Sequence, residues 1–512
     1  MDSFLGTERF QLLARLGAGG MGVVYEALDR ELDVRVALKA LPDLHPDALL
    51  RFKNEFRALQ DLHHPNLVHL GELFCEGHRW FFTMELVRGV DFLTWVRRLE
   101  GRGRAQSPAV SSGRQDITAP TVIMDSLGEV RTAPPVAADG ERLRFGLRQL
   151  AAGLEALHGA GKIHRDIKPS NILVTEDGRL VLLDFGLIAD VDHGGSDGIN
   201  DVVGTAHYMA PEQAAGAPLG PEADWYSVGV VLFEALTARK PFAGTAERVL
   251  ELKQRVQPPR PRLLSTDVDV DLDQLCTGLL HIDPAERRRA LDGLPQVCDW
   301  DPSEGLSQPG GRIRFVGREP ELAALTAAAG DSRRHAVTLL IEGESGVGKS
   351  ALMRRFLDRV AGMPGAVALE GHCYEHESIP FKAVDGVIDA LSQRLRALPA
   401  GEVQTLLPPG IAVAAQVFPV LTRVEAVARA RQTAHGILDP VELRRRLFAA
   451  VRGLFGRLAE ARTLVVAIDD LQWADADSLA LLAELMRPPD APQLLLVATV
   501  RSDLAATRPD GP

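Results

Sequence analysis

The stretch GESGVGKS, residues 343–350, has the residue types and the spacing of a loop that binds phosphates, G-x-x-x-x-G-K-[ST]. The loop between Gly343 and Gly348, together with the start of a following helix, would wrap its backbone amides around the phosphates. Lys349 would reach the β- and γ-phosphates, and Ser350 would be a ligand of Mg²⁺. The motif predicts a site for ATP with Mg²⁺.

Such a site needs an acidic partner for the metal ion, and the stretch TLVVAIDD, residues 463–470, provides one. Asp469 ends an apolar run that predicts a buried strand, and it would contact Mg²⁺ through water, while Asp470 could polarise an attacking water. Arg501 lies where a polar residue that senses the γ-phosphate is expected. The alternative interpretation, a buried strand with solvated acids at its end, becomes much rarer once the phosphate loop is present.

A second candidate site for the same ligand begins near the N-terminus, in LGAGGMGVVYEA. Gly17, Gly19, Gly22 and Val24 follow the pattern G-x-G-x-x-G-x-V. This pattern alone is weak, because glycine loops are common and a plain turn would also explain it. The segment VALK follows at the distance of the next strands, and its last residue, Lys39, could reach the α- and β-phosphates.

A helix is predicted next, within FKNEFRALQDLHHPNLV, residues 52–68. Its apolar residues recur at helical spacing: Phe52, Phe56, Leu59 and Leu62. Glu55 on this helix can pair with Lys39.

Three further motifs follow in order: HRDIKPSN at 164–171, DFG at 184–186 and APE at 210–212. Over residues 10–298 the sequence resembles the eukaryotic-like Ser/Thr protein kinases of bacteria. The resemblance implies the two-lobed protein-kinase fold, a β-rich part followed by a mostly helical part. It also implies ATP and Mg²⁺ as cofactors and proteins as substrates.

The resemblance assigns a role to each polar residue of these motifs. Asp184 would hold Mg²⁺ between the β- and γ-phosphates, and Asn171 would bind a second Mg²⁺. Asp166 would orient the acceptor hydroxyl and take its proton, and Lys168 would stabilise the transferred phosphoryl group. Tyrosine kinases usually lack a lysine at that position, and Thr205 also fits the Ser/Thr pattern. The acceptor is therefore expected to be serine or threonine.

Other matches to the family concern positioning. Backbone groups from Glu85 to Val87 would contact adenine. Asp224 should anchor the backbone of the catalytic loop, and Glu212 should pair with Arg287 inside the helical part.

Two functions from different classes fit these motifs. The leading hypothesis is an active Ser/Thr kinase, regulated or scaffolded by a C-terminal ATPase-like module. The alternative is a signalling scaffold in which the phosphate loop at 343–350 is the functional switch and the kinase domain only binds ATP. Inactive kinases usually lose one of three residues, and Lys39, Asp166 and Asp184 are all present. The sequence therefore favours the active enzyme.

The C-terminal part has a resemblance of its own. FVGREPELAAL, GESGVGKS, IDDLQWAD and LLLVATVR resemble, over residues 313–503, the signal-transduction ATPases with numerous domains, a class of AAA-like P-loop proteins. In that family the module is usually a nucleotide-gated switch, and a helical lid and winged-helix domain usually follow the strand that ends here at Arg501. Only eleven residues follow Arg501. We therefore expect the module to be incomplete at its C-terminus, to bind nucleotide weakly and to hydrolyse it hardly at all.

These motifs are distributed over two predicted domains, residues 10–298 and 313–512, joined by a Pro/Gly/Ser-rich linker at 299–312. Residues 101–141 lack helical or strand periodicity and are predicted to be a flexible insertion. In the second domain, buried strands alternate with helices, which predicts a parallel sheet covered on both faces. The expected fold class is a multi-domain protein, α+β in the kinase part and α/β in the P-loop part.

The composition limits the classes of partner and the compartments that fit this protein. The net charge of −12 argues against binding to nucleic acid or to anionic membranes. The four cysteines are scattered, which fits a reducing compartment, and HCYEH, residues 372–376, lacks the second ligand pair of a zinc site. No apolar run approaches the roughly 18 residues of a membrane span. We expect a cytoplasmic protein.

The remaining expectations concern phosphorylation and assembly. The chain could self-associate, and we expect it to phosphorylate itself in two hydroxyl-rich stretches. The candidate acceptors are Ser196 and Thr205 in the activation segment and Ser107, Ser111, Ser112, Thr118 and Thr121 in the insertion.

Overall fold

The structure is a computed structural model of the chain. It describes residues 4–19, 22–60, 62–77, 79–97, 122–124, 130–132, 138–184, 206–299, 317–433 and 439–502. The predicted linker, apart from Asp299, and all of the candidate phosphorylation sites lie outside these residues.

The chain forms two compact units. The first comprises Met1–Lys39, Ala58–Leu70 and Thr83–Pro309. The second comprises Ala40–Arg57, Gly71–Phe82 and Gly310–Pro512. The second unit therefore includes two segments from within residues 10–298, and the predicted division at residues 299–312 stays a prediction.

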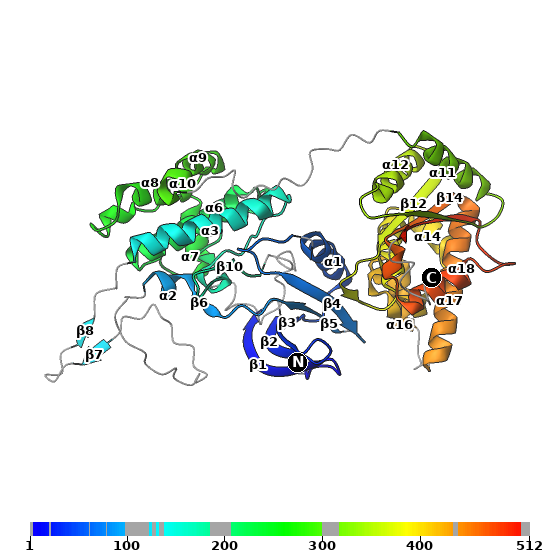
Figure 1. Cartoon of the computed structure of the whole chain (residues 1–512), viewed down its shortest axis with the longest axis horizontal. Helices are drawn as coiled ribbons and strands as arrows, with labels where there is room; N and C mark the ends of the chain where they lie inside the picture. The colour runs from blue at the N-terminus through cyan, green and yellow to red at the C-terminus, as the bar shows by residue number, and fades with distance from the viewer. Residues whose placement is uncertain are drawn as a thin grey trace. The chain divides into compact units, whose positions relative to one another are not determined.

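The first unit begins with β-structure. Strand β1 (Phe10–Gly19) pairs antiparallel with β2 (Gly22–Asp29), and β3 (Val34–Ala40) follows (Figure 1). The pairing runs from Phe10 opposite Asp29 to Gly19 opposite Gly22, so the predicted glycine loop is the tip of a hairpin. Gly22 has a φ of 118°, a conformation that residues with a side chain rarely adopt.

The rest of the first unit is mostly helical. A small sheet in the order β10-β9-β6 accompanies the helices. Its strands are β6 (Gly89–Asp91), β9 (Ile172–Thr175) and β10 (Leu180–Leu182). The helical segments are α2 (Phe92–Val96), α3 (Gly140–Gly159), η1 (Pro169–Asn171), α5 (Pro211–Ala214), α6 (Glu222–Thr237), α7 (Ala246–Lys253), η2 (Pro261–Leu263), α8 (Val270–Leu279), α9 (Pro284–Ala290), η3 (Leu291–Gly293) and α10 (Leu294–Cys298).

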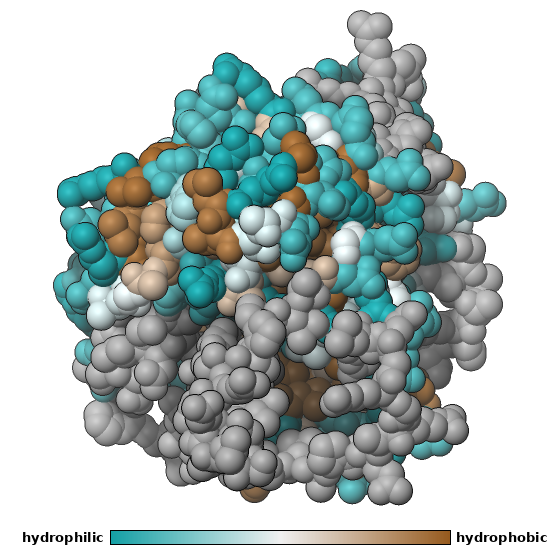
Figure 2. All heavy atoms as spheres, turned by 90° about the vertical axis from the view of Figure 1, so that its left-hand side faces the viewer, coloured by the Kyte–Doolittle hydropathy of each residue, from teal (hydrophilic) through white to brown (hydrophobic). Residues whose placement is uncertain are grey.

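Helix α6 is the centre of this helical part. Its residues from Ala223 to Ala235 are all buried, as expected for a helix that is apolar on every side. The β-rich and then helical order is the predicted two-lobed kinase arrangement. Figure 2 looks at the helical part and shows brown, hydrophobic side chains among teal ones on this face. In the helical part of the first unit, the exposed apolar residues include Leu263 and Val270, with 76% and 51% of their surface accessible.

The predicted insertion at 101–141 is not wholly irregular. Strands β7 (Val122–Met124) and β8 (Val130–Thr132) pair antiparallel within it. Helix α3 then begins at Gly140, where Asp139 caps it by accepting hydrogen bonds from two amides of its first turn. The prediction of no regular structure is therefore wrong for these short segments, which are too brief to show a periodicity.

The second unit contains a parallel four-stranded sheet in the order β11-β15-β14-β12. The strands are β11 (Val337–Gly343), β12 (Ala366–His372), β14 (Thr463–Asp469) and β15 (Leu494–Arg501). Alternate residues of β14 enter different cores: Leu464, Val466 and Ile468 enter one, and Val465 and Ala467 the other. The sheet is thus buried on both faces, as the apolar strands predicted.

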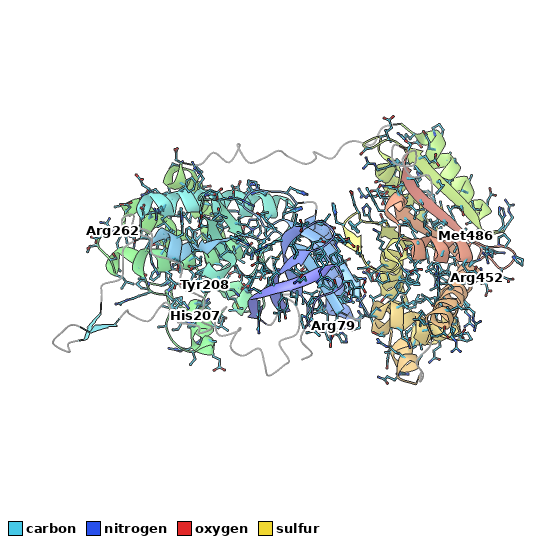
Figure 3. The ribbon with its side chains drawn as sticks, turned by 60° about the horizontal axis from the view of Figure 1, so that its bottom comes forward. Arg79, His207, Tyr208, Arg262, Arg452 and Met486 are labelled. Atoms are coloured by element: carbon cyan, nitrogen blue, oxygen red, sulfur yellow. The ribbon has the colours of Figure 1, made fainter. Side chains whose placement is uncertain are left out.

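Helices cover both faces of this sheet. They are α11 (Glu319–Asp331), α12 (Lys349–Ala361), α13 (Lys382–Arg396), α14 (Ala400–Leu406), α15 (Ile411–Val417), η5 (Pro419–Arg423), α16 (Glu425–Thr433), α17 (Pro440–Ala461), η6 (Leu471–Trp473) and α18 (Ala476–Leu485). Arg452 of α17, labelled in Figure 3, donates to Glu484 of α18 at 2.9 Å.

The N-terminal segments of the second unit are helix α1 (Pro46–Gln60) up to Arg57 and most of strands β4 (Leu70–Glu76) and β5 (Arg79–Met84). A short strand, β13 (Glu377–Ser378), pairs parallel with β4, so the order here is β5-β4-β13. In the described part of the chain, no helix has the length and apolar character needed to cross a membrane.

Candidate functional site

The catalytic-loop residues meet around Asp166, as predicted. The amide nitrogen of Asn171 donates to the backbone carbonyl of Asp166 at 2.8 Å and to its Oδ2 at 3.0 Å. The Lys168 ammonium lies 2.9 Å from the same Oδ2. The other carboxylate oxygen, Oδ1, is buried and has no hydrogen-bond partner among the described residues. One oxygen is thus fixed by Asn171 and Lys168, and the other has no hydrogen bond in the described structure.

A second aspartate positions this loop. Asp224, at the start of α6, is 1% exposed, and its two carboxylate oxygens each accept a backbone N–H, from His164 and from Arg165, both at 2.8 Å. His158 Nε2 lies 2.8 Å from the same carboxylate. The loop needs such support because Arg165 has a φ of 67°, in the left-handed region. The predicted anchoring role of Asp224 is confirmed.

Lys39 and Asp184 form an ion pair in the first unit. The Lys39 ammonium lies 2.5 Å from Asp184 Oδ1, and Lys39 is 5% exposed. The predicted phosphate contact and the predicted Mg²⁺ ligand therefore share one place. Glu55 lies on the part of α1 that belongs to the second unit, so its pairing with Lys39 stays a prediction.

The predicted adenine contacts are only partly available. The backbone N–H of Glu85 donates to the His69 carbonyl at 2.9 Å, so it is already used. The Glu85 side chain binds Arg179 at 2.6 Å, and this hydrogen bond lowers the pKa of the Glu85 carboxyl. The Glu85 carbonyl and the backbone of Val87 remain the predicted adenine contacts.

The glycine hairpin has open space beside Gly17. Gly17 pairs with Val24 across the hairpin, and Gly19 pairs with Gly22. A Cβ atom at Gly17 would meet no atom of the described residues within 4 Å. The fold itself therefore does not require glycine at this position, whereas a phosphate lying close to the backbone would.

The predicted pair between Glu212 and Arg287 is confirmed. Arg287 is fully buried, and its guanidinium contacts the Glu212 carboxylate and donates to the carbonyls of Glu222 at 3.0 Å and His281 at 2.8 Å. It ties α5, α6 and α9 together.

The second site is the predicted phosphate loop, which lies between β11 and α12. Gly346 and Gly348 have φ values of 81° and 88°, which lets the loop turn sharply. The Lys349 ammonium donates to the carbonyls of Gly343 at 2.9 Å and Glu344 at 2.8 Å, and α12 begins at Lys349. The loop thus holds its lysine back on its own backbone, at the helix N-terminus where phosphate would bind.

The predicted Mg²⁺ ligands of this site lie together. Burial alone would raise the pKa of Asp469, but hydrogen bonds with His372, Thr499 and Ser350 lower it to about 2. Thr499 Oγ1 donates to Asp469 Oδ1 at 2.5 Å. A carboxylate that stays ionised next to a serine hydroxyl offers the oxygen ligands that Mg²⁺ prefers, so the residues fit the ion.

The neighbouring residues are also placed. Asp470 has a φ of 55°, and its backbone N–H donates to Thr499 at 2.8 Å. Gln472 donates to Asp470 at 2.9 Å and accepts from the backbone N–H of Arg501 at 3.2 Å. Asp470 and Arg501 are therefore linked through Gln472.

Sequence reasoning missed His372. Its ring lies 3.5 Å from Asp469 and 3.8 Å from Asp470, and the three side chains could hold one metal ion between them. The sequence stretch HCYEH was set aside because it has no second ligand pair. The signal was its place at the carboxyl end of a strand, because His372 and Asp469 are register partners on adjacent parallel strands.

Comparison with known proteins agrees with this geometry. The protein kinase domain family matches residues 10–296, more than half of the chain, which therefore belongs to the protein kinase family. The AAA ATPase domain family matches residues 314–497. The chain is thus a protein kinase domain followed by an AAA-like ATPase domain.

Individual relatives are bacterial kinases. Serine/threonine-protein kinase PknA of Mycobacterium tuberculosis is 31% identical over 290 residues, 55% of this chain and 58% of PknA. The chain thus spans less than two thirds of that relative. Serine/threonine-protein kinase PknL of the same species is 31% identical over 318 residues, 61% of this chain and 70% of PknL. A crystal structure of a point mutant of the M. tuberculosis PknI kinase domain is 21% identical, covers 58% of this chain and 99% of that chain, and has a TM-score of 0.40.

Proposed function

We propose that this protein transfers the γ-phosphate of ATP to serine or threonine residues of proteins. We further propose that a kinase domain, residues 10–298, works together with a regulatory nucleotide-binding module, residues 313–512. The observation that carries the proposal is the state of Asp166. One of its oxygens is fixed by Asn171 and Lys168, and the other is buried without a partner among the described residues.

Each residue has a physical task in this reaction. Asp166 Oδ1 accepts the hydrogen bond of the acceptor hydroxyl and then its proton, while Lys168 offsets the charge on the phosphoryl group in transit. Asp184 and Asn171 would hold Mg²⁺, which neutralises phosphate charge when bound. Lys39, which pairs with Asp184 in this structure, would contact the α- and β-phosphates when ATP is bound.

The test is phosphotransfer by the full chain from labelled ATP to peptides that offer serine, threonine or tyrosine. Asp166→Asn and Lys39→Met should each lower the rate by about 10³-fold or more without unfolding the protein, because they remove charge and not packing. Asp267→Asn, an exposed aspartate outside the site, is the matched control. Activity near wild type in Asp166→Asn would overturn the assignment, and so would a preference for tyrosine.

The second candidate function is a scaffold switched by nucleotide at the phosphate loop. The arrangement of Lys349, Ser350 and Asp469 favours it. If wild type and the kinase variants all show only background phosphotransfer, the kinase proposal fails. Nucleotide binding by the wild type that is lost in Lys349→Ala would then support the switch as the function.

Finer points belong to the same proposal. We propose a cytoplasmic protein with protein substrates and without nucleic-acid partners, which phosphorylates itself and could self-associate. The net charge of −12 and four free cysteines support this setting. Phosphopeptide mapping of the active chain against Asp166→Asn would test self-phosphorylation.

A further inference from the structure

Helix α1 buries two basic side chains within the second unit. Lys53 and Arg57 are 1% and 7% exposed. Three acidic residues from more than 300 positions later, Glu377, Asp385 and Asp389, are 1%, 6% and 5% exposed beside them. Charged side chains are rarely buried to this degree, because each loses its hydration, so their pairing must be close and complete.

The hydrogen bonds meet this requirement. Lys53 Nζ donates to both oxygens of Asp385, at 2.9 and 2.8 Å, and to Asp389 at 2.8 Å. Arg57 donates to Glu377 through Nε at 2.7 Å and through Nη2 at 3.1 Å, and the same Nη2 donates to Asp385 at 2.8 Å. Asp385 joins both bases, so the five side chains form one network and not separate pairs.

Other contacts surround this network. Asp47 of α1 lies 2.8 Å from Arg396 and 2.5 Å from Arg423. Leu50 of α1 belongs to the same hydrophobic core as α13 and α17. The pairing of β13 with β4 adds backbone hydrogen bonding. Salt bridges, apolar packing and strand pairing therefore all join the same two regions of the chain.

These contacts use one side of α1. Asp47, Leu50, Lys53 and Arg57 are spaced by three, three and four residues, which places them in one stripe along a helix. Glu55 is two residues from both bases, about 200° around the axis from Lys53, so it lies on the opposite side. A helix held by the stripe presents Glu55 away from it.

We propose that residues 377–423 of the C-terminal module form a docking surface for α1, with Glu377, Asp385 and Asp389 as an acidic clamp. The docked helix carries Glu55 in a fixed orientation, so the clamp controls how readily Glu55 meets Lys39. This second step rests on the proposed kinase function. Three acids face two bases, so the surface selects a helix with two basic residues four positions apart, and the chain's own α1 supplies them.

The test is amide hydrogen exchange of the full chain, followed in peptides that cover residues 46–57. Asp385→Asn keeps the shape of the side chain but removes the charge shared by both bases. It should speed exchange in these peptides by about tenfold or more, because removing one partner leaves buried charges uncompensated. Arg334→Ala is the control, since it breaks an exposed pair with Asp331 in the same unit, and it should leave the peptides unchanged.

A second, milder variant keeps the test valid if Asp385→Asn does not fold. Arg396 is 46% exposed at the rim of the surface, and Arg396→Ala should speed exchange of the same peptides by roughly threefold while the fold persists. Unchanged exchange in both variants would overturn the docking surface. Because exchange is measured without ATP, that outcome would leave the kinase proposal standing.

Kinase assays on the same variants test the second step. Looser docking should lower kcat/KM by roughly tenfold, because Glu55 is then no longer held ready for Lys39. Faster exchange with an unchanged kcat/KM would show that the surface exists but does not control the kinase. A background rate in the wild-type chain as well would instead be a failure of the proposed function.

Discussion

Two single residues, Gly17 and Asp166, have features that a bound ligand would explain. Gly17 lies in a strand, where glycine is ordinarily unfavourable, and yet no neighbour in the described structure would clash with a Cβ atom there. Asp166 keeps a buried oxygen that no described residue contacts by a hydrogen bond. Under the proposed function, bound ATP would lie beside Gly17 and an acceptor hydroxyl would donate to Asp166 Oδ1.

Gly17→Ala tests whether Gly17 is needed for the stability of the fold or for the binding of ATP. The free energy of unfolding should change by less than about 1 kcal/mol, since there is space for the methyl group, while the KM for ATP should rise by roughly tenfold as the methyl group approaches the phosphates. Thermal unfolding and initial rates at varied ATP check this. A large loss of stability with an unchanged KM would contradict it.

Asp389 makes the acidic clamp sensitive to pH. Burial, together with the neighbouring carboxylate of Asp385, raises the pKa of Asp389 to about 6, against the attraction of Lys53 and Arg57. The folded chain then binds this proton more tightly than the unfolded chain. The resulting stabilisation is full at low pH and is lost as pH rises through about 6.

Asp389→Asn should remove this dependence, because an amide stays neutral. We expect the variant to gain thermal stability relative to wild type at about pH 7, and to gain less, or nothing, at about pH 5. Unfolding midpoints of both proteins at the two pH values give the comparison, in which contributions from other titrating groups cancel. An equal effect of the substitution at both pH values would refute the expectation.

At the scale of elements, α7 holds the segment that precedes α5. Lys253, the last residue of α7, is fully buried and donates to the carbonyls of Ala206 at 2.7 Å and His207 at 3.1 Å, and also to that of Met209. Burial lowers the pKa of its ammonium to about 7. His207 and Tyr208 of this segment are labelled in Figure 3, and the Tyr208 hydroxyl donates to Glu234 of α6 at 2.7 Å.

Lys253→Met should therefore loosen the segment. The side chain keeps its length, but three carbonyls lose their donor, which should cost about 3 kcal/mol of unfolding free energy. Urea unfolding measures the loss, and limited proteolysis should cut near residues 206–209. Arg248→Met, on the same helix at an exposed position, serves as the control and should change little.

At the scale of the whole molecule, the chain combines two domains from families that use ATP, a protein kinase domain and an AAA ATPase domain. The kinase residues Lys39 and Asp184 are in the first unit, and the phosphate loop with Lys349 is in the second. The acidic clamp lies within the second unit, where it holds the helix that carries Glu55.

Because the chain has two such domains, we expect two nucleotide sites. Calorimetric titration with a non-hydrolysable ATP analogue and Mg²⁺ should give a stoichiometry of two for the wild type. Lys349→Ala should abolish one site and Lys39→Met should weaken the other, since each removes the main positive charge on the phosphates. A wild-type stoichiometry of one, unchanged in Lys349→Ala, would contradict a functional phosphate loop.

Much of this organisation is determined by the sequence alone. The phosphate loop, the catalytic loop and the strands β14 and β15 of the parallel sheet were predicted at nearly their observed positions, whereas β12 was not predicted. Each depends on residues close together in the chain, where spacing fixes which side chains share a strand end, a helix start or a turn. Even the anchoring by Asp224 and the pair of Glu212 with Arg287 followed from motifs of the kinase family.

The tertiary structure decided which distant residues meet. Sequence periodicity showed the face of α1 that carries Phe52, Phe56 and Leu59, but the second stripe, with Lys53 and Arg57, looks like an ordinary solvated face. Its burial depends on carboxylates more than 300 residues away. His372 likewise joins Asp469 only through the register of two parallel strands. The sequence does not show which oppositely charged residue a given charged residue will meet. Only packing and strand register determine which buried charges pair.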